Sequence, residues 1–424
     1  MTDMAPRRWR RTVTALVALA TAFVVAGGVP APAGVPTATA AGSGWVGAWG
    51  ASPQPGDTGI PGMPPAASLE NQTLRLVVHP HTGGSTVRVR LSNAFGDRPL
   101  TIGRATIARR TTGPAVDTSS VRPLTFAGRT SVTVARGAEI TSDPVLFSLP
   151  AGQDVAVDLH LPQPTGIPTG HLEARQTSYV STAGDHAGAA SLPVSRATGS
   201  WFFLSRIDVL DATRAGVVTF GDSITDGTQS TADANNRYPD HLATELAGQS
   251  ATRDLAVVNA GIGGGRLLHD RIGPRALDRF DRDVLSVPSV KYVLVQIGIN
   301  DIGVADFLDP SENVTSRQII EGYQTLIERA HARGLRAYGG TLTPVGGYIY
   351  DNPTAQKKRD EVNEWLRSTA GKPGGFDKVA DFDAVIRDPA NPSRLLPAYD
   401  SGDHIHPNDR GYAAMADAAE DLFL

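Results

Sequence analysis

A serine stands directly after a short apolar run in the second half of the chain. The run covers residues 217–220 and is followed by the tripeptide Gly221-Asp222-Ser223. A buried strand that ends in this way would hold the serine at the mouth of a parallel sheet, where α/β proteins place their ligands. A serine hydroxyl is a poor nucleophile unless a neighbouring base takes its proton during the attack. Ser223 is therefore a candidate nucleophile that still needs a base.

A suitable base and its supporting carboxylate occur together near the C-terminus, at His406 and Asp403. An imidazole titrates near neutral pH and can remove the proton of a serine. An aspartate can accept the second ring N–H, which fixes the tautomer and stabilises the imidazolium. The sequence therefore predicts a catalytic triad of Ser223, His406 and Asp403. His404, which lies between the last two, is interpreted as a bystander.

Attack of a serine on an ester carbonyl creates an oxyanion that needs preorganised hydrogen-bond donors. The candidate donors are the backbone N–H of Ser223, the backbone N–H of Gly264 and the side-chain amide of Asn300. A glycine at 264 keeps side-chain atoms away from an approaching substrate, and an asparagine offers an NH₂ donor without the proton ambiguity of an acid. Asp301 is better suited to cap a helix or to accept a hydrogen bond in a loop than to act as a catalytic acid.

None of these short patterns is specific by itself. The run 263–265 could also suggest a phosphate-binding loop, but it lacks the Gly-Lys-Ser/Thr ending and the spacing of a dinucleotide-binding motif. The combination of four blocks is more specific than any one of them, because they occur in a definite order and mostly directly after predicted strands. These blocks contain Ser223, Gly264, Asn300 and the Asp403–His406 pair. Together they favour ester hydrolysis.

The elements that must position these residues alternate between strands and helices from about residue 212 onward. The predicted strands are residues 217–220, 255–259, 292–297, 336–342 and 379–382. Apolar residues at helical spacing predict helix faces at Ile320, Tyr323, Ile327 and Ala330, at Val362, Trp365 and Leu366, and at Tyr412, Met415, Ala419 and Leu422. Nearly continuous apolar strands between helices indicate a parallel sheet covered on both faces. Ser223, Gly264 and Asn300 each follow a strand, so we expect them at one edge of that sheet.

The preceding part, residues 45–211, has the pattern of an all-β domain. Apolar and polar residues alternate along residues 87–91 and 155–161, and Gly83-Gly84 between 74–78 and 87–91 predicts a hairpin. Many short strands separated by Gly and Pro favour a β-sandwich or a jelly-roll-like domain. Trp45 and Trp49 could stack on sugar rings if exposed, but packing beneath the β-domain is the preferred interpretation.

Residues 1–41 resemble a secretory signal peptide. Four arginines between residues 7 and 11 precede an apolar segment at 13–25, and Ala38-Thr-Ala40 offers a cleavage site. The apolar segment is too short to span a membrane comfortably, so export and cleavage are favoured over a membrane anchor. Paired arginines leave Sec and twin-arginine export both open. The net charge of −4 shows no basic stripe, which argues against a nucleic-acid partner, and without cysteine the chain has no disulfide, thiolate nucleophile or cysteine zinc site.

From about residue 216 to the C-terminus, the four blocks resemble those of the SGNH hydrolases, also called GDSL esterases/lipases. The resemblance places Ser223 at the nucleophile, Gly264 at the oxyanion glycine, Asn300 at the oxyanion asparagine and Asp403 and His406 in the triad. Gly261 and Gly263 remain register alternatives for the oxyanion glycine, and Ile224 stands where leucine is frequent. The start Trp45-Val-Gly-Ala-Trp49 is similar to secreted actinobacterial members with an N-terminal β-rich domain.

This resemblance implies a flavodoxin-like three-layer hydrolase domain at 212–424 and acyl-enzyme chemistry with no metal and no cofactor. We therefore expect a secreted serine esterase that acts on a small-molecule or polysaccharide ester, with no stable membrane insertion after signal cleavage. Short acyl groups on carbohydrate are the first substrate hypothesis. Secretion and the jelly-roll-like companion domain favour a carbohydrate, and the loop 339–348 after a predicted strand favours a small acyl group because it carries few large apolar groups. Lipid or lysophospholipid hydrolysis is the second. A noncatalytic carbohydrate-binding protein on a hydrolase scaffold is the third.

Overall fold

The computed structural model describes residues 44–60, 64–304 and 309–424. The predicted signal peptide at 1–41 lies outside these residues. Within the described ranges, no helix is long and apolar enough to cross a membrane. All described residues belong to one compact unit. The described residues up to Asp211 are called the β-region, and those from Ala212 onward are called the α/β-region.

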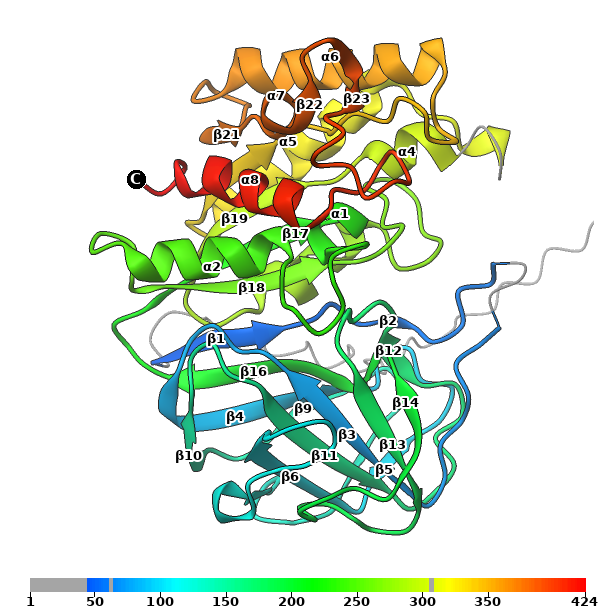
Figure 1. The fold of residues 1–424 in the computed structure, drawn as a ribbon, viewed down its shortest axis with the longest axis vertical. Coiled ribbons are helices and arrows are strands. Elements are labelled where there is room, and N and C mark those ends of the chain that lie inside the picture. Colours follow the sequence, from blue (N-terminus) through cyan, green and yellow to red (C-terminus); the bar gives the residue numbers. More distant parts are fainter. Residues whose placement is uncertain (1–43, 61–63, 305–308) are drawn as a thin grey trace, which may run out of the picture. The chain divides into compact units, whose positions relative to one another are not determined.

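The β-region is built from antiparallel strands (Figure 1). One sheet has the order β1 (Trp45–Gly50), β16 (Leu204–Leu210), β4 (Gly84–Ser92) and β10 (Val145–Leu149), with β9 (Glu139–Thr141) also on β4. A second has the order β14 (Val194–Thr198), β13 (Ser178–Ala183), β3 (Gln72–Val78), β11 (Val155–Leu161), β6 (Arg104–Arg109) and β7 (Arg122–Leu124). Smaller pairings join β15 (Trp201–Phe202), β12 (Thr169–His171) and β2 (Gln54–Pro55), and β5 (Leu100–Ile102) with β8 (Val132–Val134). A short 3₁₀ turn, η1 (Thr118–Ser120), completes the region.

The two larger sheets share one apolar core, as expected for a sandwich. Along β4, the valines at 87 and 89 are buried while Arg88 between them is half-buried, which confirms the predicted alternation. Strand β11 differs, because Asp158 on its other face is also buried. Its carboxylate forms an ion pair of 2.7 Å with the buried Arg75, so that face is covered and the charge compensated.

The predicted hairpin at Gly83-Gly84 is wrong. Strands β3 and β4 occur where expected, but β3 pairs with β11 and β13 while β4 pairs with β16, β10 and β9. The chain therefore crosses from one sheet to the other at this point. Neither Gly83 nor Gly84 has a positive φ, whereas the tight turns of two-residue hairpins require one. Trp45 and Trp49 are only 8% and 7% exposed, which confirms packing over sugar stacking.

A five-stranded parallel sheet forms the centre of the α/β-region. Its order is β18 (Leu255–Gly261), β17 (Ala215–Gly221), β19 (Val290–Gln296), β20 (Arg336–Gly340) and β21 (Lys378–Ala380). Numbered along the chain, this is the 2-1-3-4-5 order of flavodoxin-like folds, whose switch point lies between the first and third strands. The predicted strand at 379–382 runs too far, because the side chain of Asp381 accepts a hydrogen bond from Ala384 N and so starts a helix at Phe382.

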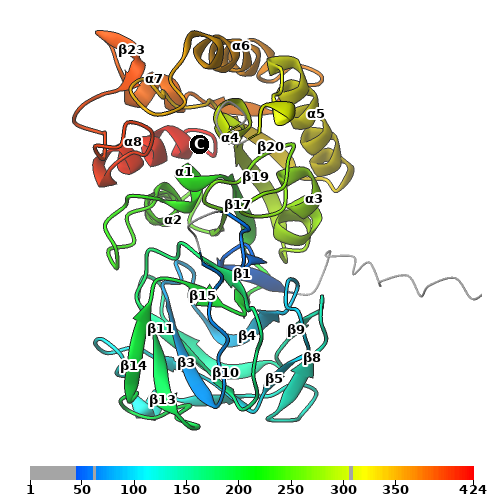
Figure 2. The same cartoon turned by 90° about the vertical axis from the view of Figure 1, so that its right-hand side faces the viewer.

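Helices cover both faces of this sheet, as Figure 2 shows for α2 and α8 on one side and α3 and α5 on the other. Val217 contributes to the core under α2 (Tyr238–Gly248), α7 (Phe382–Ile386) and α8 (Asp409–Glu420). The next residue, Val218, contributes to the opposite core under α3 (Ala276–Phe280), α5 (Ser316–Ala332) and α6 (Pro353–Thr369). The expected three-layer arrangement is present. One predicted helix-face residue is wrong: Ile320 is half-buried, and Ile319 beside it faces the core.

Shorter elements lie mainly in the loops that follow the strands. They are α1 (Ser223–Asp226), the π-helical turn η2 (Asp281–Leu285), α4 (Ile299–Gly303), the 3₁₀ turn η4 (Pro310–Glu312) and the antiparallel pair β22 (Arg387–Asp388) and β23 (Asn391–Leu395). Two of these, α1 and α4, begin just beyond the carboxyl ends of the adjacent strands β17 and β19. They therefore place Ser223 and Asn300 at the switch point.

Candidate active site

Ser223, His406 and Asp403 form one continuous hydrogen-bonded chain. Nε2 of His406 lies 2.8 Å from Oγ of Ser223, and its Nδ1 lies 2.7 Å from Oδ2 of Asp403. With neutral histidine, this arrangement puts the proton on Nδ1 and leaves Nε2 to accept the serine proton. Ser223 and His406 are 183 positions apart in the sequence, yet the three predicted residues are already in position for nucleophilic attack.

Asp403 is held by more than the imidazole. Its Oδ1 accepts hydrogen bonds from the backbone N–H groups of Ile405 and His406. Partial burial disfavours the charged carboxylate, but these hydrogen bonds and the neighbouring imidazole outweigh it, and the pKa of Asp403 is held well below its ordinary value. The carboxylate therefore stays ionised while it orients His406.

A tight strand-to-helix turn presents the nucleophile. A Cβ at Gly221, the last residue of β17, would collide with the side chain of Thr225 and with the carbonyl oxygen of Gln296. The side chain of Asp222 caps α1 by accepting a hydrogen bond from Ile224 N at 3.1 Å. Ser223, the first residue of α1, is 7% exposed. The glycine and the cap together explain why this tripeptide aims a hydroxyl out of the sheet.

The backbone hydrogen bonds favour Gly264 over Gly261 and Gly263 as the candidate oxyanion glycine. The N–H of Gly261 donates to Asn259 Oδ1 at 2.8 Å, and the N–H of Gly263 donates to Asp226 Oδ2 at 2.9 Å. The N–H of Gly264 has no acceptor within the described part of the chain. Of the three glycines, Gly264 is therefore the one with a donor available for an oxyanion.

The structure also gives a different reason for glycine at 264 from the one that the sequence suggested. Its φ is +66°, in the left-handed region that favours glycine. A Cβ there would overlap the side chain of Ile272. Backbone strain and contact with Ile272, more than approach of the substrate, require the glycine.

Asn300 has both ends of its side-chain amide fixed. Nδ2 donates to Gly265 O at 3.0 Å, and Oδ1 accepts from the hydroxyl of Tyr350 at 3.0 Å. An amide nitrogen carries two hydrogens, so one N–H of Asn300 remains to stabilise an oxyanion. Asn300 is 4% exposed, and in such a site a fixed donor stabilises developing charge better than in water.

These residues open onto one cleft of about 220 Å³, lined by Ser223, Gly264, Asn300 and His406. The other lining residues are the apolar group Leu172, Ile272, Tyr348, Tyr350 and Ile405, the polar group Gln54, Glu173 and Thr228, here called the polar edge, and Gly263. The loop predicted as a wall, 339–348, does reach the cleft through Tyr348. Tyr350, two residues further along, was not predicted, although it also contacts Asn300.

Three of the lining residues come from the β-region, which sequence reasoning treated separately from the site. Gln54 donates to Ile272 O at 3.0 Å and accepts from Leu172 N at 3.3 Å. Oε2 of Glu173 accepts from the hydroxyl of Thr228 at 2.7 Å. No motif surrounds these three residues in the sequence, so only the tertiary structure reveals that they line the cleft.

Two neighbouring residues behave as the sequence predicted. Asp301 accepts hydrogen bonds from the backbone N–H groups of Leu267 and Leu268, at 2.7 and 2.9 Å, and so holds a loop. His404 bonds through Nδ1 to Asp400 and is outside the triad's hydrogen bonds. Among the described residues, no group of three or more His, Cys, Asp or Glu side chains is arranged to hold a metal ion.

Burial perturbs two acids at this edge of the sheet. It raises the pKa of Asp222 to about 7, against the hydrogen bond from Ile224 N, and the charge of Asp301 adds to the effect. It also raises the pKa of Asp301 to about 6, although two backbone N–H groups favour the charged form. Oδ2 of Asp222 has no hydrogen-bond partner among the described residues, so no hydrogen bond at that oxygen stabilises the charged form against burial.

Residues 219–414 match the model of the GDSL-like lipase/acylhydrolase family. A putative lipolytic protein of the G-D-S-L family from Desulfitobacterium hafniense is 22% identical, over 49% of this chain and 99% of that one, with a TM-score of 0.38. A lipase/acylhydrolase from Enterococcus faecalis is 20% identical, over 49% and 94%, with a TM-score of 0.39. An acetyl xylan esterase from Geobacillus stearothermophilus is 19% identical, over 49% and 94%, with a TM-score of 0.38. No curated protein sequence matches the chain.

Proposed function

We propose that this carboxylic ester hydrolase, whose residues 219–414 belong to the GDSL-like lipase/acylhydrolase family, removes short acyl groups from carbohydrates outside the cell. The observation that carries the chemistry is the pair of hydrogen bonds that His406 makes, to Ser223 at 2.8 Å and to Asp403 at 2.7 Å. The remaining donors of the cleft, at Gly264 and Asn300, suit the oxyanion that follows attack by Ser223.

The first half of the reaction forms an acyl-enzyme. Oγ of Ser223 attacks the ester carbonyl carbon while Nε2 of His406 takes the hydroxyl proton. The carbonyl oxygen becomes an oxyanion and accepts hydrogen bonds from the N–H groups of Ser223, Gly264 and Asn300. His406 then gives its proton to the departing alcohol oxygen, and the bond between that oxygen and the carbonyl carbon breaks.

The second half returns the enzyme to its starting state. A water takes the position of the alcohol, and Nε2 of His406 accepts its proton as the oxygen attacks the acyl carbon. The same donors hold the second oxyanion. Collapse breaks the bond to Oγ of Ser223, which recovers a proton from His406, and the carboxylic acid leaves.

The size and polarity of the cleft support a small acyl group and a polar alcohol. Its volume of about 220 Å³ is below the roughly 300 Å³ at which pockets for drug-sized ligands begin. Tyr348 and Tyr350 supply an apolar wall on one part, and Gln54, Glu173 and Thr228 supply a polar edge on another. Hydroxyl groups of a sugar would find acceptors along that edge.

Secretion is supported by the N-terminal sequence, in which four arginines, an apolar segment and Ala38-Thr-Ala40 follow in the order of a signal peptide. Cleavage near residue 41 would leave a mature chain with a formal net charge of −7, because four Arg and one Asp are removed. Such a charge suits a soluble secreted protein. N-terminal sequencing of the protein from culture medium tests this part of the proposal.

One observation favours the second candidate, hydrolysis of lipid or lysophospholipid esters. Ile349 is 66% exposed and lies, in the sequence, between the two tyrosines that line the cleft. An exposed isoleucine next to these tyrosines in the chain suits contact with an acyl chain or a lipid surface. The carbohydrate hypothesis is preferred because the polar edge lies within the cleft and Ile349 is a single residue.

The experiment measures the turnover of a series of esters with different acyl chain lengths by the mature protein and by its Ser223→Ala variant. We expect turnover of p-nitrophenyl acetate that falls as the acyl chain lengthens to octanoate, acetate release from acetylated xylan, and at least about a 10³-fold loss in Ser223→Ala. Ser250→Ala, on an exposed turn, is the matched control and should retain full activity.

The outcomes separate the hypotheses. Faster turnover of long acyl chains and of lysophospholipid would favour the lipid hypothesis. Full activity in Ser223→Ala would refute the assignment of the nucleophile. Sugar binding by isothermal titration with no turnover by the wild-type protein would instead support a noncatalytic binding protein.

A further inference from the structure

We infer that His171, a residue of the β-region, is a positioning residue for the oxyanion loop of the esterase site. His171 is the last residue of β12 and contacts no reacting group. It acts on the loop through one buried side chain, Asp226. The inference rests on the proposed esterase chemistry and adds to it a role for the β-region.

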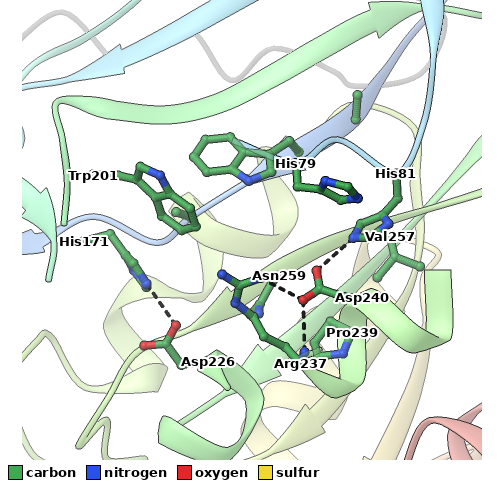
Figure 3. A pocket seen from close by; sticks show the side chains of 14 residues that line it. His79, His81, His171, Trp201, Asp226, Arg237, Pro239, Asp240, Val257 and Asn259 are labelled. Atoms are coloured by element: carbon green, nitrogen blue, oxygen red, sulfur yellow. Dashed lines mark hydrogen bonds and ion pairs between the residues drawn. The ribbon is translucent and has the colours of Figure 1, made fainter. Parts of the chain in front are cut away.

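Asp226 connects the β-region with the loop that carries Gly264. Its Oδ1 lies 2.9 Å from Nε2 of His171, as Figure 3 shows. Its Oδ2 accepts a hydrogen bond of 2.9 Å from the N–H of Gly263, the residue before Gly264. Both oxygens are therefore used, one toward the β-region and one toward the oxyanion loop.

The same aspartate ends the short helix that Ser223 begins, α1 (Ser223–Asp226). A displacement of Asp226 would therefore affect both the helix of the nucleophile and the donor at Gly264. The side chains of His171 and Asp226 are only 3% and 4% exposed. At such burial the pair is little screened by solvent, and a carboxylate left without its partner is strongly disfavoured.

The β-region fixes His171 from two further directions. Nδ1 of the imidazole lies 3.2 Å from the carbonyl oxygen of Ser52, and the ring stacks on Trp201 with centroids 5.5 Å apart. A carbonyl on one side and a carboxylate on the other are both acceptors, so the two nitrogens suit a doubly protonated ring. Burial opposes that charge, but the Asp226 carboxylate outweighs it and the pKa of His171 is raised.

The space between these residues is too small for a second binding site. The cavity bounded by His171, Trp201, Asp226, Arg237 and Asn259 has a volume of about 30 Å³, room for about two waters. The polar side chains around it are occupied mainly with one another (Figure 3). They connect the β-region to the α/β-region, and the pair that reaches the oxyanion loop is His171 with Asp226.

A second ion pair of the same kind provides a matched control. Nε2 of His81, also in the β-region, lies 2.8 Å from Oδ1 of Asp240 in α2, and these side chains are 14% and 10% exposed. Oδ2 of Asp240 bonds to Arg237, at the start of the same helix. Loss of His81 therefore removes a comparable contact between the regions without touching the loop at 263–264.

The test compares His171→Ala with His81→Ala in the mature protein. For p-nitrophenyl acetate we expect kcat to fall about 10- to 100-fold in His171→Ala, with KM within about threefold, because a small misplacement of a catalytic group costs rate more than binding. Phenylboronic acid, which forms a tetrahedral adduct with a catalytic serine, should lose affinity by a similar factor. His81→Ala should keep kcat and boronate affinity within about twofold of the wild type. Both variants are expected to lose thermal stability, so this loss alone does not explain a fall in kcat that only His171→Ala shows.

His171→Gln provides the rescue. Its amide nitrogen can replace Nε2 as a donor to Asp226, so it should recover most of kcat. If His171→Ala does not fold, His171→Leu against His81→Leu takes its place, because leucine fills much of the space of the ring but donates no hydrogen bond; the kcat loss is again expected only in the His171 variant. Equal kcat and boronate affinity in the His171 and His81 variants would overturn the inference. An inactive wild-type enzyme would refute the proposed function instead.

Discussion

The hydroxyl of Tyr350 lies 3.0 Å from Oδ1 of Asn300, and Nδ2 of the same amide donates to Gly265 O at 3.0 Å. A phenol at this site donates most readily to an oxygen, so the pair determines which end of the amide carries the hydrogens. The second N–H of Asn300 is left for a group bound in the cleft, which Ser223 also lines. Tyr350 consequently contributes to the oxyanion site without being a donor to it.

Substitutions of Asn300 and of Tyr350 should both lower kcat, but by different factors. Asn300→Ala removes a donor and is expected to lower kcat about 10²- to 10³-fold, with little change in KM. Tyr350→Phe leaves the amide of Asn300 in place and removes the hydroxyl that bonds to it, so we expect a kcat loss of about three- to tenfold. Steady-state kinetics with p-nitrophenyl acetate measure both. A larger loss in Tyr350→Phe than in Asn300→Ala would contradict this assignment.

Asp403→Asn should separate orientation from general-base chemistry. An amide in place of the carboxylate can donate to Nδ1 of His406, which would favour the wrong tautomer and remove the charge that stabilises the imidazolium. We expect kcat to fall about 10³- to 10⁴-fold near neutral pH, with the fold and KM retained. Circular dichroism and steady-state kinetics check the two halves of this prediction. A loss below about tenfold would show that Asp403 is dispensable.

The sequence was sufficient to predict which residues of the candidate site come together. Ser223, Gly264, Asn300 and the Asp403–His406 pair each follow a strand or share a loop, and the parallel sheet brings strand ends together. The nearly continuous apolar strands, such as residues 217–220, also predicted a sheet covered on both faces. These features depend on periodicity and on the order of elements, both of which are visible along the chain.

The features that were predicted wrongly or missed depend on contacts between residues far apart in the sequence. Gly83-Gly84 has the composition of a hairpin, but the pairing partners of β3 and β4 are strands far along the chain. Glu173 and His171 carry no motif, and their roles depend on contacts with Thr228 and Asp226, each 55 positions away. Such contacts between two regions have no local signal in a single sequence.

Glu173 should influence which alcohols the enzyme accepts. It is the carboxylate among the residues that line the cleft, so it should disfavour a negatively charged alcohol and accept hydrogen bonds from a neutral sugar. Glu173→Gln is expected to raise kcat/KM for an acetylated glucuronate about three- to tenfold, most at low ionic strength, since solvent screens this exposed group. Acetylated methyl glucoside should change by less than about twofold. An unchanged ratio of the two substrates would contradict a role for Glu173.

Asp222 should make stability depend on pH. Its folded-state pKa of about 7, raised by burial from an ordinary value of 3.8, means that the folded protein retains a proton that the unfolded chain loses. The contribution to stability is therefore complete below about pH 4 and is lost as the pH rises through about 7. Asparagine resembles the protonated acid and can still accept from Ile224 N through its amide oxygen.

Asp222→Asn should consequently match the wild type in free energy of unfolding near pH 4 and exceed it near pH 8, by on the order of 3 kcal/mol. Urea unfolding at intervals between these pH values measures the difference. Asp254→Asn, at an exposed position, is the control and should give a curve parallel to that of the wild type. If the Asp222→Asn curve were also parallel, the buried carboxyl would not be retaining its proton, and the unpartnered Oδ2 would need another explanation.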